Sequence, residues 1–137
     1  MARSLADIIQ FFDELEATVV SLWDGQSSAS SSFWSPATDV YTTEQYVNVI
    51  VELAGVEREN LKILVSPLVL EVSGTRPTPA SFHKAQNFYG LEIAYGLFRK
   101  RITLPCRVEP RAVRTQLKDG LLRLRLRRAQ TRSIAVE

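Results

Sequence analysis

The sequence predicts an all-β protein, an immunoglobulin-like antiparallel β-sandwich with an amphipathic helical arm before it and a short extended tail after it. Three observations lead to this fold class. From about residue 40 onward apolar and polar residues alternate, which is the period of half-buried β-strands. Turn-forming residues separate these segments at intervals of roughly 8–12 residues, a spacing typical of sandwiches. The length of 137 residues, 45% of them hydrophobic, suits one domain with a buried core.

The N-terminal arm is expected to comprise residues 1–36. Its first part, residues 4–23, carries apolar residues at helical spacing, and Ser4 is a suitable N-cap. Residues 25–32 are rich in serine and predict a flexible linker. Such a helix can pack on its own domain or present its apolar stripe to another molecule. The flexible linker favours the second interpretation.

The β-domain is expected over residues 37–128, with a tail over residues 129–137. Strands are predicted at residues 46–55, 60–66, 68–74 and 96–105 and on both sides of a turn within residues 112–128. That turn is Lys118-Asp119-Gly120, and an Asp-Gly pair is among the strongest short signals for a hairpin. Residues 75–87 contain two prolines and predict a long loop. No helix is expected in this domain.

Charge is distributed unevenly along the chain. Residues 1–96 carry 5 basic and 12 acidic residues, whereas residues 97–137 carry 12 basic and 3 acidic residues. A basic segment can bind nucleic acid, or it can attract the acidic half of the same chain or of another copy. Because the basic residues alternate along predicted strands and do not form one continuous run, the sequence favours attraction between the two halves.

The sequence offers no recognisable catalytic, cofactor or metal site. His83 is the single histidine and Cys106 the single cysteine, and a dyad of these two residues is left open. The glycine-rich motifs of phosphate and dinucleotide sites are absent, as is any cysteine and histidine spacing typical of zinc. We therefore predict a binding protein that is not an enzyme and needs no cofactor.

The sequence also predicts a location. No apolar run approaches the roughly 18 residues that span a bilayer. The N-terminal segment has acidic residues within its apolar stretch, which makes it a poor secretory signal. One cysteine cannot form an internal disulfide, which fits a reducing compartment. A cytoplasmic protein that does not act at membranes is expected.

Several segments resemble motifs of small heat-shock proteins, in the order in which that family has them. The segment "YGLFRKRITLP" (Tyr95–Pro105) is similar to the Y-G-x-F-x-R-x-f-x-L-P motif of their α-crystallin domain. The segment "WSPATD" resembles the W-x-P-x-x-D start of that domain, and Ile134-Ala135-Val136 resembles the I-x-I/V motif of the tail. Further matches are "VELAGV", "LVLEVSGTR" and "TQLKDGLLRLRL". Together they extend roughly over residues 34–137.

The resemblance implies an ATP-independent chaperone, a holdase, which binds partly unfolded proteins and prevents their aggregation as a dynamic homo-oligomer built from dimers. Clients would contact apolar side chains of the arm and of the residues that follow it. These are Ile8, Ile9, Phe12, Leu15, Val19, Leu22, Trp23, Phe33 and Trp34. Besides clients and other copies of the chain, ATP-dependent chaperones that refold the clients are expected partners.

Two contacts between subunits are also implied by the resemblance. In the dimer, a strand within residues 88–93 would pair with the partner's first strand. The implied dimer residues are Val40, Tyr41, Thr42, Phe88, Tyr89, Leu91, Glu92 and Lys100. In the oligomer, Ile134 and Val136 of the tail would enter a groove between two edge strands of a neighbouring subunit. The implied groove residues are Leu61, Ile63, Val65, Val113, Thr115 and Leu117.

The sequence is also compatible with two other functions. A β-sandwich of this type can serve as a co-chaperone module that binds a folded chaperone, although such a module needs neither the apolar arm nor the tail motif. A nucleic-acid-binding protein would use residues 97–137, with the alternating arginines of the last strand facing phosphates. We rank both below the holdase and do not expect nucleic acid among the partners.

Overall fold

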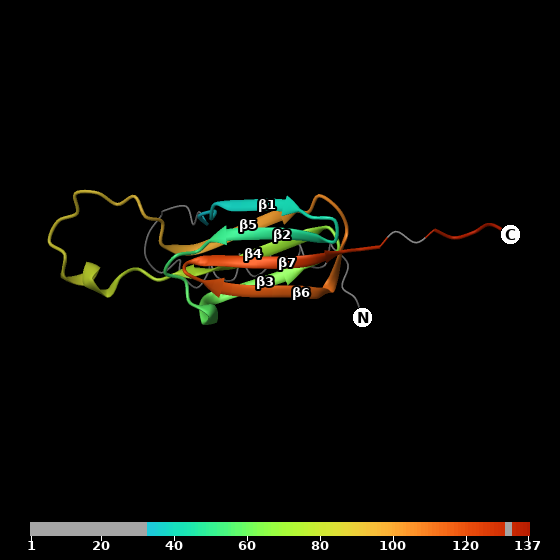
Figure 1. Ribbon diagram of the computed structural model, residues 1–137. Coiled ribbons are helices and arrows are strands. Elements are labelled where there is room, and N and C mark those ends of the chain that lie inside the picture. Colours follow the sequence, from blue (N-terminus) through green and yellow to red (C-terminus); the bar gives the residue numbers. More distant parts are fainter. Residues whose placement is uncertain (1–32, 131–132) are drawn as a thin grey trace. The chain divides into compact units, whose positions relative to one another are not determined.

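The computed structural model describes residues 33–130 and 133–137 (Figure 1). The predicted helix at residues 4–23 and the linker at residues 25–32 lie outside the described residues, so both stay predictions. The domain belongs to a compact unit that spans Phe33–Glu137. This unit begins ahead of residue 37, where the sequence analysis placed the start of the domain.

The domain consists of two β-sheets. In chain order its strands are β1 (Thr38–Thr42), β2 (Tyr46–Glu52), β3 (Leu61–Val65), β4 (Val69–Arg76), β5 (Gly96–Thr103), β6 (Val108–Lys118) and β7 (Leu121–Arg128). One sheet has the order β1-β2-β7-β6 and the other the order β3-β4-β5. All pairings in both sheets are antiparallel, and the sheets form two layers (Figure 1). The prediction of an all-β antiparallel sandwich is confirmed.

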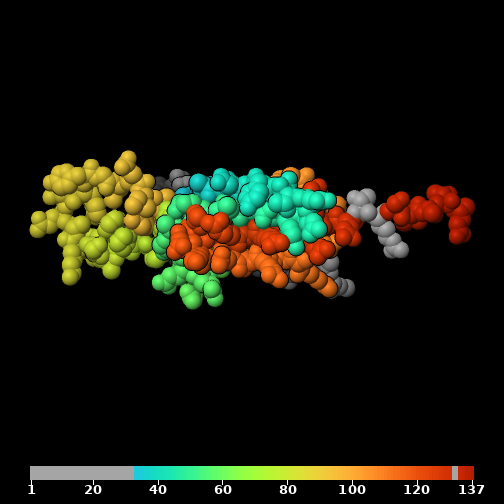
Figure 2. Space-filling model, viewed as in Figure 1, coloured from blue at the N-terminus to red at the C-terminus, as the bar shows by residue number. Residues whose placement is uncertain are grey.

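The hydrophobic core lies between the two sheets. Its buried residues are Val47, Val49, Val51, Leu53, Val56, Leu70, Val72, Phe98, Ile102, Leu104, Val108, Leu122, Leu124 and Leu126. Within β2 and β7 they fall at every second position, so the alternation in the sequence decides which side of each strand is buried. Each fully buried side chain of this size contributes about 1.5–3 kcal/mol. The opposite sides of the strands face outward, and Figure 2 shows the outer face of the β1-β2-β7-β6 sheet.

Two hairpin connections follow the local signals in the sequence. Asp119 and Gly120 form the turn between β6 and β7 with φ angles of 52° and 75°, as a type I′ turn requires. A Cβ atom at Gly120 would lie 3.2 Å from the Cβ atom of Ala54, so the position also has little room for a side chain. Between β3 and β4, the Ser66 hydroxyl donates to the carbonyl of Val69 at 3.1 Å and accepts from its N–H at 3.2 Å.

Two short 3-10 helices differ from the prediction. η1 (Arg58–Asn60) precedes β3 and η2 (Ala80–Lys84) lies in the loop before β5, so the expectation of a domain without helix is wrong. Such helices need only one turn of backbone hydrogen bonds, for example from the N–H of Phe82 to the carbonyl of Pro79 at 3.0 Å. Alternation of apolar residues does not signal them. In the described part of the chain, no helix has the length and apolar character needed to cross a membrane.

β6 is also longer than expected. It begins at Val108, whereas the sequence placed its start at residue 112. Its pairing with β7 shifts register between Val108 and Val113. The shift accommodates Pro110, which has no N–H to donate and is tolerated at a bulge in an edge strand.

Candidate assembly and binding surfaces

The predicted contacts between subunits lie at the open edges of the two sheets. β1 and β6 are the edges of the four-stranded sheet, and β3 and β5 are the edges of the three-stranded sheet, where Trp34 already pairs with β5 at Phe98. An edge strand presents backbone N–H and C=O groups that another strand or an extended peptide can pair with. Each predicted contact between subunits therefore involves a strand edge with which a second chain can pair.

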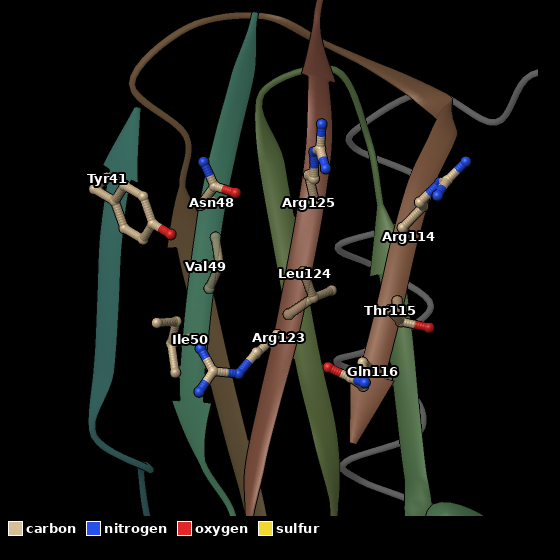
Figure 3. A pocket seen from close by; sticks show the side chains of 10 residues that line it. All are labelled: Tyr41, Asn48, Val49, Ile50, Arg114, Thr115, Gln116, Arg123, Leu124 and Arg125. Carbon is tan, nitrogen blue, oxygen red and sulfur yellow. The ribbon is translucent and has the colours of Figure 1, made fainter. Parts of the chain in front are cut away.

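The predicted groove residues lie on two of these edges. Leu61, Ile63 and Val65 of β3 and Val113 and Leu117 of β6 are partly buried and pack against the core. The sixth residue, on β6 between the last two, is Thr115, and it is exposed. β3 runs behind β6 on one side of the sandwich (Figures 1 and 3). The structure thus brings the six residues to the same side of the domain, and their binding to a tail stays a prediction.

The tail motif is exposed. The exposed fractions of Ile134 and Val136 are 80% and 98%, and residues 133–137 have no regular secondary structure. In an extended segment, residues two positions apart point to the same side. The two apolar side chains are therefore available to another surface.

The predicted dimer residues lie in two segments. In β1, Val40 and Tyr41 have exposed fractions of 41% and 51%, and Thr42 is exposed as well. The loop between β4 and β5 exposes four apolar side chains and Glu92; the four are Phe88 at 51%, Tyr89 at 98%, Leu91 at 62% and Ile93 at 63%. Residues 88–93 form no strand within the single chain. A strand there needs a second chain to pair with, so the implied pairing stays a prediction.

Lys100, the remaining predicted dimer residue, lies on β5. It is half-buried and opposite Val72 in register. Because Phe98 and Ile102 on either side of it are core residues, Lys100 leaves the strand toward the inner side of the sheet. A lysine can bury its methylene chain there and extend its ammonium group toward water.

Aromatic contacts organise the loop between β4 and β5, which the sequence analysis did not anticipate. The ring of Phe82 in η2 lies 5.2 Å from the ring of Phe88 and 5.7 Å from the ring of Tyr95. Both pairs have the edge-to-face geometry that aromatic rings prefer. The close spacing of aromatic residues along this loop is the sequence signal that could have predicted these ring contacts.

Arg76 joins three segments of the domain. Its guanidinium lies 4.2 Å from the centre of the Trp34 ring, and it donates to the carbonyls of Ala94 at 2.8 Å and Ala54 at 2.9 Å. Trp34 is held further by its indole N–H, which donates to the carbonyl of Gly96 at 3.0 Å. These contacts favour an anchoring role for Trp34, and its predicted contact with clients stays a prediction, as does that of the half-buried Phe33.

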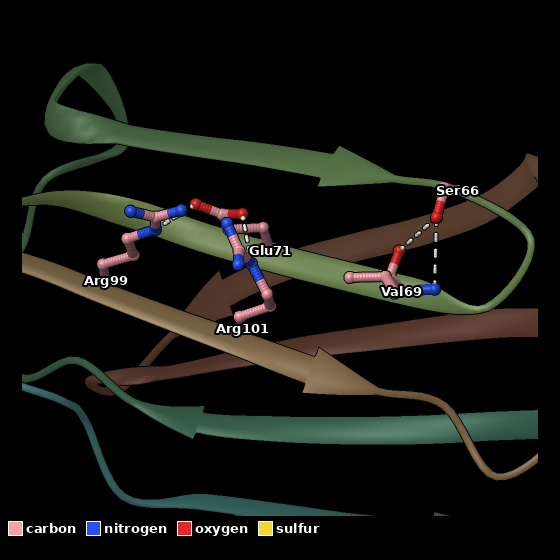
Figure 4. A network of polar contacts seen from close by, with 5 residues as sticks. All are labelled: Ser66, Val69, Glu71, Arg99 and Arg101. Atoms are coloured by element: carbon pink, nitrogen blue, oxygen red, sulfur yellow. Dashed lines mark hydrogen bonds and ion pairs between the residues drawn. The ribbon is translucent and has the colours of Figure 1, made fainter. Parts of the chain in front are cut away.

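A buried carboxylate on the outer side of the three-stranded sheet was missed by the sequence analysis (Figure 4). Glu71 has an exposed fraction of 3% and accepts hydrogen bonds from Nε of Arg99 at 2.6 Å and Nε of Arg101 at 3.2 Å. Arg101 is its partner in register, and Arg99 leaves the same side of β5. Pairing the two predicted strands in this register would have revealed the cluster.

The dyad left open by the sequence is not formed. His83 lies in η2 ahead of β5, whereas Cys106 follows β5, and that strand is 8 residues long. The two side chains are thus at opposite ends of the strand. Across the described ranges 33–130 and 133–137, no three His, Cys, Asp or Glu side chains gather as possible metal ligands.

Comparison with known proteins identifies relatives of this chain. The chain is 30% identical over 92 residues to small heat shock protein C4 of Rickettsia felis and 31% identical over 91 residues to spore protein SP21 of Stigmatella aurantiaca. These matches cover 67% and 66% of this chain but 56% and 53% of the two relatives. The chain therefore spans little more than half the length of these relatives.

Solved structures agree with the sequence relatives. Heat shock protein 16.0 from Schizosaccharomyces pombe is 28% identical with a TM-score of 0.63, and the match covers 76% of this chain and 99% of that one. A small heat-shock protein from Xylella fastidiosa has a TM-score of 0.64 at 21% identity, over 77% of this chain and 97% of that one, and supports the fold. The sequence model of the Hsp20/alpha crystallin family matches residues 39–137. By its sequence, its sandwich and its edge strands, the chain belongs to the Hsp20/alpha crystallin family of small heat-shock proteins.

Proposed function

We propose that the protein is an ATP-independent holdase that binds partly unfolded proteins and prevents their aggregation. The observation that carries this proposal is apolar surface outside the core. In the described part of the chain, Tyr89, Leu91, Ile93, Ile134 and Val136 have exposed fractions from 62% to 98%. A chain that exposes such side chains is suited to bind other chains, because burial of apolar surface contributes about 25 cal/mol per Å².

Two of these surfaces support assembly into a dynamic homo-oligomer. The loop around residues 88–93 would add to the exposed β1 edge of a partner and form the dimer. Ile134 and Val136 would then enter the β3 and β6 surface of a neighbouring dimer. Each tail contact buries two side chains, so individual links are weak enough for subunits to exchange.

Client binding is assigned to the N-terminal arm. Its apolar stripe at residues 8–23 matches the kind of surface that an unfolding protein exposes. Clients held in this way would be passed to ATP-dependent chaperones for refolding, and the cytoplasm is the compartment in which we expect this to occur.

The holdase proposal is tested by light scattering of a heat-labile enzyme without ATP. We expect the full chain to suppress aggregation and a chain without residues 1–24 to lose most of this protection. The matched control keeps the arm and replaces the exposed Lys84 and His83 of η2 by glutamine, which should leave suppression unchanged. Absence of protection by the full chain would refute the holdase, and full protection by the shortened chain would remove the arm from the mechanism.

The tail contact is tested by native mass. Ile134→Ala combined with Val136→Ala removes both apolar side chains, so we expect the assembly to shrink toward dimers in light scattering coupled to gel filtration. Ser133→Ala combined with Glu137→Ala changes the exposed neighbours and should leave the mass unchanged. An unaltered mass in the first variant would exclude the tail as an assembly link.

A further inference from the structure

The outer face of the four-stranded sheet gathers five arginines. On β7, Arg123, Arg125 and Arg127 alternate with the buried leucines and therefore point outward. On β6, Arg114 is the partner of Arg125 in register. Arg111 joins Arg114, Arg125 and Arg127 around one shallow hollow of about 390 Å³. We call this set the arginine face.

Among the described residues, no acidic side chain lines the two hollows within the arginine face, and Glu44 adjoins Arg127 only around a third hollow at the end of β7. A second hollow, of about 410 Å³, adjoins the first because both include Arg114 and Arg125, and the residues around the two hollows include neither aspartate nor glutamate. None of the five arginines forms an ion pair with another described residue. Figure 3 shows Arg114, Arg123 and Arg125 projecting from neighbouring strands, and no described segment covers this face in Figure 2.

This arrangement of like charges lowers the stability of the domain. Like charges directly opposite each other on paired strands repel, as Arg114 and Arg125 do here. A face that served only solubility would intersperse both signs of charge. A contact that partly offsets the repulsion is that of the Arg125 guanidinium, which lies 3.8 Å from the centre of the Tyr46 ring. An anionic ligand would relieve the repulsion, so the face is suited to one.

The geometry of the arginine face favours a phosphate backbone. Successive outward residues on a strand are about 6.8 Å apart, so an extended chain of phosphates can meet the arginines of β7 in turn. A guanidinium presents a planar fork of donors to phosphate oxygens. The amide side chains of Asn48 and Gln116 and the 51% exposed ring of Tyr41 lie around the same hollow. Amides can hydrogen-bond to bases, and a tyrosine ring can stack on them.

We propose that the arginine face binds single-stranded nucleic acid. Unpaired bases are what the amides and the tyrosine can reach from a flat sheet, whereas a duplex requires an element that enters its groove. An anionic membrane fits less well, because membrane-surface binding uses projecting apolar side chains and Ile50, the apolar outward residue here, is half-buried. The alternation of basic residues, which counted against nucleic acid in the sequence, is what aligns them on one face of the sheet.

The test uses the full chain and a fluorescein-labelled oligouridylate in anisotropy titrations at several salt concentrations. Replacement of Arg123, Arg125 and Arg127 by glutamine should weaken binding at low salt by roughly tenfold or more and should lower the slope of log K against log salt by about 2. The matched control removes the same charge elsewhere, with Arg58, Lys84 and Arg107 replaced by glutamine, all of them exposed. This control should keep at least most of the affinity and of the slope.

Further measurements keep the test decisive. The variant with lysine at the three β7 positions retains the charge and should bind with an intermediate affinity. If the glutamine triple variant does not fold, as judged by circular dichroism, the exposed pair Arg114→Gln and Arg127→Gln replaces it. Absence of binding by the unaltered chain, equal weakening by face and control variants, or binding to phosphatidylglycerol vesicles or polyglutamate but not to RNA would each overturn the proposal. Suppression of client aggregation without RNA should be the same in all variants, so failure here is distinct from failure of the holdase.

Discussion

The two outer faces of the sandwich use arginine in opposite ways. On the three-stranded sheet, Arg99 and Arg101 alternate along β5 and share the buried carboxylate of Glu71. On the four-stranded sheet, Arg123, Arg125 and Arg127 alternate along β7, and none of them forms an ion pair with another described residue. The sequence patterns of the two strands are alike, and only their partners differ.

The difference separates a structural cluster from a binding surface. The side chain of Glu71 is 4% exposed and those of Arg99 and Arg101 are 15% and 37% exposed, so the buried carboxylate is stabilised by two guanidinium groups that are partly shielded from water. Arg123, Arg125 and Arg127 of β7 are exposed and form no ion pair with another described residue, so their positive charge remains available to a ligand. Whether an arginine on a strand stabilises the fold or stays free to bind a ligand therefore depends on the residue opposite it in register.

The largest effect is expected from Glu71→Gln. The substitution leaves two neighbouring guanidinium groups without their carboxylate, and we expect the free energy of unfolding to fall by about 2–3 kcal/mol. This is less than for a fully buried pair, because the Arg101 side chain is 37% exposed. Urea unfolding followed by circular dichroism at one fixed protein concentration measures the change. The exposed Glu59 provides the control, since Glu59→Gln should change stability by less than about 0.5 kcal/mol; an equally small loss at Glu71 would mean that the two faces do not differ.

A smaller effect, of opposite sign, is expected when the second face receives a carboxylate. Gln116 is the partner of Arg123 in register, so Gln116→Glu should stabilise the domain by about 0.2–1 kcal/mol. The same variant should bind oligouridylate more weakly, because the new carboxylate occupies part of the arginine face. Gln86→Glu makes the same change of charge in the exposed loop and should alter neither property. A loss of stability in the Gln116 variant would contradict the assignment of free charge to this face.

The smallest effect concerns the repulsion between strands. Arg114→Gln removes one of two like charges that face each other in register, and we expect a gain in unfolding free energy of about 0.2–0.5 kcal/mol together with weaker binding of oligouridylate. Arg107→Gln removes an exposed arginine elsewhere and serves as the control for net charge. Thermal unfolding and anisotropy on the same samples would show whether stability and binding move in opposite directions. Equal shifts in both variants would point to net charge alone.

Much of the fold follows from local signals. The valines of β2 and the leucines of β7 predict their buried sides because a strand has a side-chain period of two. The Asp119-Gly120 turn was predicted because few residues adopt positive φ angles at both positions. η2 was not predicted, because a single turn of helix leaves no periodic pattern in the sequence. The start of β6 at Val108 was not predicted either, because a proline such as Pro110 usually lies outside a strand.

The sequence indicated some of the candidate surfaces and gave no sign of others. The groove residues and the tail motif are implied by a resemblance and stay predictions, and the structure places the groove residues on one side of the domain. Glu71 and Arg76 were missed, because their partners lie 28 or 30 and 18 or 22 residues away. Contacts over such separations depend on which strands pair and in which register, and an alternating pattern fits several pairings equally well.

The sequence by itself determined the alternating strands, the Asp-Gly hairpin and the surplus of arginine in the last 41 residues, residues 97–137. Tertiary structure alone decided what the arginines contact. Pairing of β4 with β5 brings Glu71 to Arg101, and pairing of β6 with β7 brings Arg114 to Arg125. The physical reason is that electrostatic energy depends on the distance between charges and on their exposure to water, and the fold sets both.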